Sequence, residues 1–126
     1  MKRHMLLPLA ALLMGAFTLA VTKDKTFKGE IMDSPCAMDG SHAKMLKMEG
    51  MGDKDPNDHM AKQMCTNNCV KKMSAKYVLY DAAKKKTYEL DDQTKPEQFA
   101  GKNVNVTGTL DKDGKTLHVT NIASGS

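Results

Sequence analysis

The alternation of apolar and polar residues in the C-terminal half of the chain most constrains the fold. Residues 104–110 (VNVTGTL) have the pattern of a strand with one buried face. Residues 111–115 (DKDGK) are typical of a hairpin turn, and residues 117–122 predict the returning strand, with a bulge before its last apolar residue. Residues 77–80 and 87–90 predict a further strand pair. This half of the chain is therefore expected to be a β-sheet.

The order of the predicted elements indicates the fold class. Residues 26–33 (TFKGEIMD) alternate as a first strand, and residues 94–100 (TKPEQFA) predict one helical turn. Residues 34–74, rich in Cys and Met, predict a helical insertion between the first and second strands. The order is typical of the OB-fold, a five-stranded Greek-key barrel. We therefore predict a mainly β, OB-fold-like barrel with this insertion, and an open β-meander with a helical flap is the alternative.

The N-terminus, residues 1–20, has the three parts of a secretory signal peptide. Lys2 and Arg3 precede an apolar run over residues 5–19, and small residues favour cleavage after Ala20. An apolar run of about 15 residues is shorter than the roughly 20 that a membrane-spanning helix needs. We therefore expect a periplasmic or secreted protein with no membrane attachment after cleavage.

The charge of the remaining domain, residues 21–126, excludes some classes of partner. Removal of Lys2 and Arg3 lowers the net charge from +4 to +2, which is too weak to favour binding to nucleic acid. The sequence contains no nucleophile elbow, phosphate loop or haem motif. We therefore predict a non-enzymatic module that binds an unknown periplasmic or extracellular ligand, and the sequence does not set its oligomeric state.

Several segments resemble a family of small exported bacterial proteins of unknown function. The resemblance rests on Asp-Ser-x-Cys after the first strand, a later Cys-x-x-x-Cys, and a Gly-Lys-x-Val-x-Val-x-Gly strand. These motifs lie in residues 27–36 (FKGEIMDSPC), 65–70 (CTNNCV) and 99–110 (FAGKNVNVTGTL), and residues 76–81 (KYVLYD) also match. The strand motif is similar to that of periplasmic OB-fold proteins. The resemblance implies an exported protein with an OB-fold-like structure. It implies no activity, because the family has no established one.

The insertion is expected to contain two helices. Asp55 and Pro56 are suited to the N-cap and first position of a helix that runs to about Met73. Cys65 and Cys69 would then lie one turn apart on one face. Residues 42–51 predict a second, shorter helix, which the glycines at 50 and 52 would end.

A disulfide is one interpretation of the three cysteines. Disulfides persist in exported proteins, and the odd number leaves one thiol over. Cys65 and Cys69 are poorly placed to pair with each other in an intact helix. The predicted disulfide therefore joins Cys36 to Cys65 or Cys69 and fastens the insertion to the barrel.

A metal site is the alternative interpretation. Cys36, Cys65 and Cys69 with His42 would form a Cys₃His set suited to Zn²⁺. His59 is a weaker candidate, because it would lie on another side of the helix that carries Cys65.

The methionines extend the metal hypothesis to copper. Met45, Met48 and Met51 could present thioethers on one side of a helix, and soft sulfur ligands select Cu(I). Methionine is also a common filler of irregular cores. Two functions thus remain open: a ligand-binding module stapled by a disulfide, or a periplasmic protein that binds copper or zinc.

Overall fold

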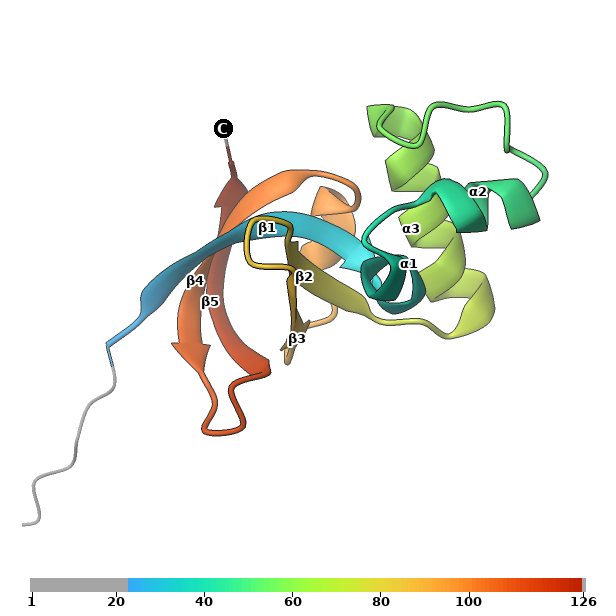
Figure 1. Ribbon diagram of the computed structural model, residues 1–126. Coiled ribbons are helices and arrows are strands. Elements are labelled where there is room, and N and C mark those ends of the chain that lie inside the picture. Colours follow the sequence, from blue (N-terminus) through green and yellow to red (C-terminus); the bar gives the residue numbers. More distant parts are fainter. Residues whose placement is uncertain (1–22, 126) are drawn as a thin grey trace, which may run out of the picture.

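The computed structural model describes residues 23–125, which form a mainly β structure with short helices (Figure 1). The elements follow the predicted order, except that the insertion begins with an additional helix. They are β1 (Lys25–Asp33), α1 (Ser34–Asp39), α2 (Ala43–Met48), α3 (His59–Met73), β2 (Tyr77–Asp81), β3 (Lys86–Leu90), the 3-10 helix η1 (Lys95–Phe99), β4 (Asn103–Leu110) and β5 (Thr116–Ser124). The predicted signal peptide, residues 1–20, lies outside the described residues.

The five strands form one mixed sheet that closes on itself in the order β1-β2-β3-β5-β4. β1 pairs antiparallel with β2 through its second half and with β4 through its first half. β3 and β5 form the parallel pair of the sheet. Because β1 has a partner on each side, the open meander is excluded.

The predicted bulge in the last strand is confirmed. Thr107 of β4 lies opposite Asn121, but the next residue, Gly108, lies opposite Val119, so Thr120 is an additional residue on β5. The two backbones approach closely here, since a Cβ atom on Gly108 would lie 2.1 Å from the carbonyl oxygen of His118. A side chain at position 108 would therefore push β4 and β5 apart.

The interior of the closed sheet is an apolar core. Ile31, Leu79, Val106 and Leu117 are fully buried in it. The inward alternation predicted for β4 is confirmed by Val104 and Val106. The other buried members of this core are Tyr77, Tyr88, Leu90, Ala100 and Ile122.

The insertion, residues 34–74, folds as a helical flap that packs beside the end of β1 (Figure 1). A second core lies between the flap and the sheet. It contains Met32 and Val78 from the sheet and, from the flap, Cys36, Ala37, Met45, Leu46, Ala61, Cys65 and Cys69. Met32 follows the inward-facing Ile31 on β1 and so lies on the opposite face, yet it is only 1% exposed because the flap covers that face.

The flap differs from the prediction in two respects, the start of α3 and the presence of α1. α3 begins at His59 and not at Pro56, because Asp58 is the N-cap and accepts a hydrogen bond from the backbone N–H of Ala61. Asp55 instead accepts from the N–H of Asn57 in a turn. α1 was not predicted, and its short length explains why periodicity did not reveal it.

We expect Gly108→Ala to destabilise the fold. The added Cβ would meet backbone of β5, which cannot rotate away, so the free energy of unfolding should fall by at least about 1–3 kcal/mol in urea titrations. Gly52→Ala is the control, because its Cβ would come no closer than 3.4 Å to Lys47. Equal urea midpoints for Gly108→Ala and the unchanged protein would contradict this prediction.

Candidate metal centre

Four buried side chains meet where the flap contacts the end of β1. Asp33, Cys36, His42 and Cys65 each offer one metal-ligand atom, and these four atoms all lie within 4.8 Å of one another. Asp33 ends β1, Cys36 lies on α1, His42 is the N-cap of α2, and Cys65 lies on α3. The cluster therefore joins the sheet to all three helices of the flap.

Local structure explains how Asp33 and Cys36 are presented together. Asp33 is the N-cap of α1, and its Oδ2 accepts a hydrogen bond of 3.0 Å from the backbone N–H of Cys36. Pro35 lies in the first turn, where its missing N–H is tolerated. Oδ1 of Asp33 is buried and has no hydrogen-bond partner among the described residues. The cap thus leaves one carboxylate oxygen available as a ligand.

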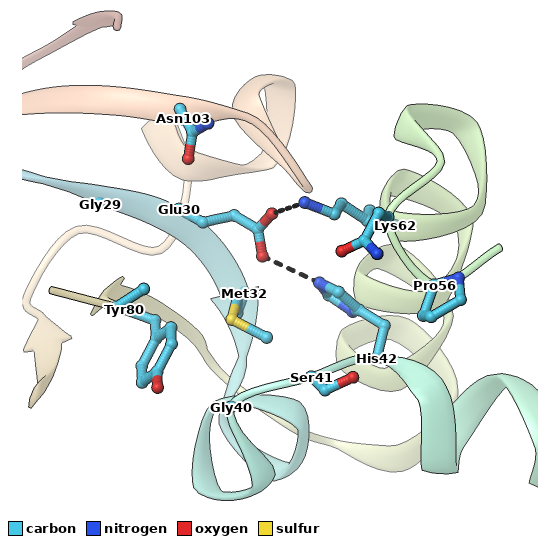
Figure 2. Close-up of a pocket in the computed structure, with 12 residues that line it drawn as sticks. Gly29, Glu30, Met32, Gly40, Ser41, His42, Pro56, Lys62, Tyr80 and Asn103 are labelled. Carbon is cyan, nitrogen blue, oxygen red and sulfur yellow. Dashed lines mark hydrogen bonds and ion pairs between the residues drawn. The ribbon is translucent and has the colours of Figure 1, made fainter. Parts of the chain in front are cut away.

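His42 is held by one of its two ring nitrogens. Its Nε2 lies 3.0 Å from Oε2 of Glu30, and Oε1 of Glu30 accepts from the ammonium group of Lys62 (Figure 2). Nδ1 is buried and, within residues 23–125, has no hydrogen-bond partner. Since Nε2 is engaged, Nδ1 is the nitrogen left for a metal.

The thiols of Cys36 and Cys65 lie in contact without a covalent bond. Their Sγ atoms are 3.8 Å apart. A disulfide requires about 2.05 Å, whereas two sulfur ligands about 2.3 Å from a tetrahedral Zn²⁺ are about 3.8 Å apart. All three cysteines lie in the described part of the chain and are free, so the disulfide predicted from Cys36 to Cys65 or Cys69 is not formed in this structure.

The pKa values in the cluster differ strongly between neighbouring groups. The hydrogen bond with Cys36 lowers the pKa of Cys65 to about 6, although burial opposes this, and His42 lowers it further. The same hydrogen bond and burial raise the pKa of Cys36. Burial disfavours charge on His42, but Cys65 and Glu30 raise its pKa to about 9. Negative charge therefore develops first on Cys65, and a cation beside it would be stabilised.

Glu30 stays ionised despite its position under the flap. Burial favours its neutral form, but the hydrogen bonds from His42 and Lys62 outweigh burial and lower its pKa. The Glu30 side chain is 12% exposed. It is the acceptor for both neighbours.

Cys69, one of the predicted ligands, lies outside the four-residue group. It is fully buried on α3, one turn beyond Cys65. Burial and the carboxylate of Asp33 raise its pKa, which favours the neutral thiol. The structure thus brings together three of the four favoured ligands, with Asp33 in the place of Cys69.

The weaker candidates occupy different environments, and Met45 belongs to the second core together with Cys36 and Cys65. His59 is exposed at the start of α3. Met45 is buried in the second core, Met48 is 68% exposed, and Met51 is half-buried. Met45 and Met48 both lie on α2, but only Met45 is buried against the second core.

A cavity of about 260 Å³ lies beside the centre, between the flap and the sheet (Figure 2). Glu30, His42 and Lys62 line it, together with the ring of Tyr80 and polar side chains from both sides, Ser41, Asn57 and Asn103. His42 thus lies between this cavity and the two thiols.

Among the comparisons with known proteins, a family of unknown function matches part of the chain. The model of the family DUF5818, described as a protein of unknown function, matches residues 72–124. The chain is similar to that family over β2 to β5. The matched segment excludes Asp33, Cys36, His42 and Cys65. No curated protein and no solved structure gives a match.

None of the helices within residues 23–125 has the length and apolar character needed to cross a bilayer.

We expect three alkylatable thiols in the protein, because its cysteines are free. The protein should be purified anaerobically without reductant, unfolded with a chelator present, alkylated, and weighed intact by mass spectrometry. Three adducts are the expected result. A single adduct, on a chain two mass units lighter, would show that two of the cysteines form a disulfide.

Proposed function

We propose that this protein binds Zn²⁺ through Asp33, Cys36, His42 and Cys65, and that the metal fastens the flap to the closed sheet. The observation that carries the proposal is the convergence of four ligand atoms within 4.8 Å in a buried position. Asp33 Oδ1 and His42 Nδ1 support it, since both are buried and lack a hydrogen-bond partner among the described residues. Buried polar atoms normally have such a partner.

The donor set supports zinc over other metals. Two thiolates, one imidazole and one carboxylate are all common Zn²⁺ ligands, and four protein ligands complete a tetrahedral site. A site closed in this way is typical of structural zinc and leaves no position for substrate. Cu(I) is the competing ion because it prefers sulfur, but the carboxylate oxygen of Asp33 is a hard ligand that suits it poorly.

We further propose that the closed sheet is an OB-fold. The strand order, the parallel pairing of β3 with β5, and the position of η1 between β3 and β4 support this assignment.

A second candidate function is ligand binding without catalysis, in the cavity under the flap. The observation that favours it is a cavity of about 260 Å³ between the flap and the sheet, lined by charged and polar side chains from both. The unknown ligand would be a small periplasmic or extracellular molecule, and nucleic acid is not the proposed partner.

We expect the mature chain to take up one Zn²⁺ per molecule, as measured by elemental analysis and by competition with a chromophoric chelator. Cys65→Ser should weaken the binding of Zn²⁺ by more than roughly 10–100-fold. That range is typical when a residue that only supports a metal ligand is replaced. Cys69→Ser is the matched control, because Cys69 lies on the same helix, is equally buried, and stands outside the ligand group.

Three outcomes would overturn the zinc proposal. One is no stoichiometric uptake of Zn²⁺ by the unchanged protein. Another is equal affinity of Cys65→Ser and Cys69→Ser. The last is uptake of Cu(I) under anaerobic conditions by a protein that does not bind Zn²⁺.

We also propose that residues 1–20 direct export and are removed after Ala20. The full chain, expressed in a bacterial host, should be recovered outside the cytoplasm with Val21 as its first residue, as read by N-terminal sequencing. Recovery of the intact chain from the cytoplasm or the membrane fraction would contradict export.

A further inference from the structure

A row of three partly or fully buried titratable side chains, Lys62, Glu30 and His42, lies directly behind the candidate metal centre. Lys62 of α3 contacts Glu30 of β1, and Glu30 contacts His42 at the start of α2 (Figure 2). The exposed fractions of these side chains are 21%, 12% and 2%. Charges are rarely buried without a role or a partner, because their removal from water is costly.

The contacts from Lys62 to Glu30 and from Glu30 to His42 determine which ring nitrogen of His42 faces the thiols. Glu30 accepts hydrogen bonds from two sides, so as a carboxylate it has no proton to donate. Nε2 of His42 must therefore carry the proton, and in the neutral imidazole Nδ1 then has the free lone pair. A lone pair at Nδ1 is what a metal in the centre requires.

Of the four proposed ligands, His42 relies most on a neighbouring side chain, Glu30, for its orientation. Asp33 and Cys36 are oriented by the cap of α1, and Cys65 lies within the fifteen-residue helix α3. His42 precedes a helix of only six residues and makes no side-chain hydrogen bond to it. Within the described residues, the contact with Glu30 is the only hydrogen bond made by its ring.

Lys62 fixes the position of Glu30 in turn. Its ammonium group occupies Oε1, which leaves Oε2 to His42. Lys62 lies three residues before Cys65 on α3, so one helix supplies both a thiol ligand and the support for the histidine.

We propose that Glu30 is the positioning residue of the metal centre, and that it holds the ring of His42 with Nδ1 directed at the metal while Lys62 holds Glu30. This inference rests on the proposed zinc function. It assigns to Glu30 a role in metal affinity, in addition to the ion pair by which Glu30 and Lys62 join β1 to α3. Residues behind metal ligands typically change affinity by roughly 10–100-fold when they are replaced.

The test compares Zn²⁺ affinity among four variants of the mature chain, by competition with a chromophoric chelator. Glu30→Ala should weaken the binding of Zn²⁺ by about 10–100-fold, because no hydrogen-bond acceptor remains for Nε2 of His42. Glu30→Gln should recover part of this loss, since its amide oxygen still accepts a hydrogen bond. Lys62→Met should have a smaller effect than Glu30→Ala.

Lys71→Met is the matched control. Lys71 lies on the same helix and pairs with Glu97, but both side chains are about half exposed or more and lie away from the centre. Its removal should leave Zn²⁺ affinity within about twofold of the unchanged protein, because exposed ion pairs contribute little.

A second measurement separates positioning from a purely structural role. Long-range ¹H–¹⁵N NMR of His42 in the zinc-loaded protein should show a metal-bound Nδ1 and a protonated Nε2. In Glu30→Ala the ring should lose this single state, and Glu30→Gln should retain it. If Glu30→Ala does not fold, as judged by circular dichroism, Glu30→Gln and Lys62→Met still carry the test.

The outcomes distinguish this inference from the proposed function. Zinc binding by the unchanged protein, with equal affinity and the same His42 spectrum in Glu30→Ala, would overturn the role of Glu30 and leave the zinc site standing. A spectrum with zinc on Nε2 in the unchanged protein would also overturn it. Absence of zinc binding in the unchanged protein would overturn both.

Discussion

The end of β1 is buried on both faces, and the rest of the structure depends on this double burial. Alternation along the strand directs Ile31 into the closed sheet and Met32 toward the flap, so one strand supplies residues to two cores. Asp33, the last residue of the strand, begins α1 as its cap. Movement of the flap away from β1 would therefore expose Met32 and free the carboxylate that caps the first helix. Sheet and flap are coupled through three consecutive residues.

The flap has few other sources of stability. Two of its helices are six residues long, and its core is made largely of Cys, Met and Ala. In the flap and at its contact with β1, four buried side-chain atoms have no hydrogen-bond partner among residues 23–125: Asp33 Oδ1, His42 Nδ1, Glu49 Oε2 and Thr66 Oγ1. Each unsatisfied group costs about 1–3 kcal/mol. Metal coordination would satisfy the first two and stabilise the flap, which is how small domains with modest cores are commonly held. The two thiols that such a metal would bind, Cys36 and Cys65, lie in contact at 3.8 Å between their Sγ atoms.

Much of the fold could be predicted because its signals are local. Alternation located the strands, and it placed the bulge before Ile122, since period-two patterning directly records which side of a strand is buried. The face shared by Cys65 and Cys69 follows from helix geometry alone, and both are buried. The start of α3 was misjudged because Asp55 and Asp58 are both acceptable caps; in the structure Asp58 caps the helix and Asp55 caps the preceding turn.

Local patterns predict the five strands, the position of the insertion, and the residue types able to hold a soft metal. They also single out Cys36, His42 and Cys65. The presence of Asp33 in place of Cys69 in the group, and of Glu30 and Lys62 behind the histidine, follows from the packing of the flap on β1. The reason is physical: these residues come from β1 and α3, about thirty positions apart, and no periodicity relates them. Their meeting depends on how the flap packs across β1, which also determines that two thiols lie in contact without bonding.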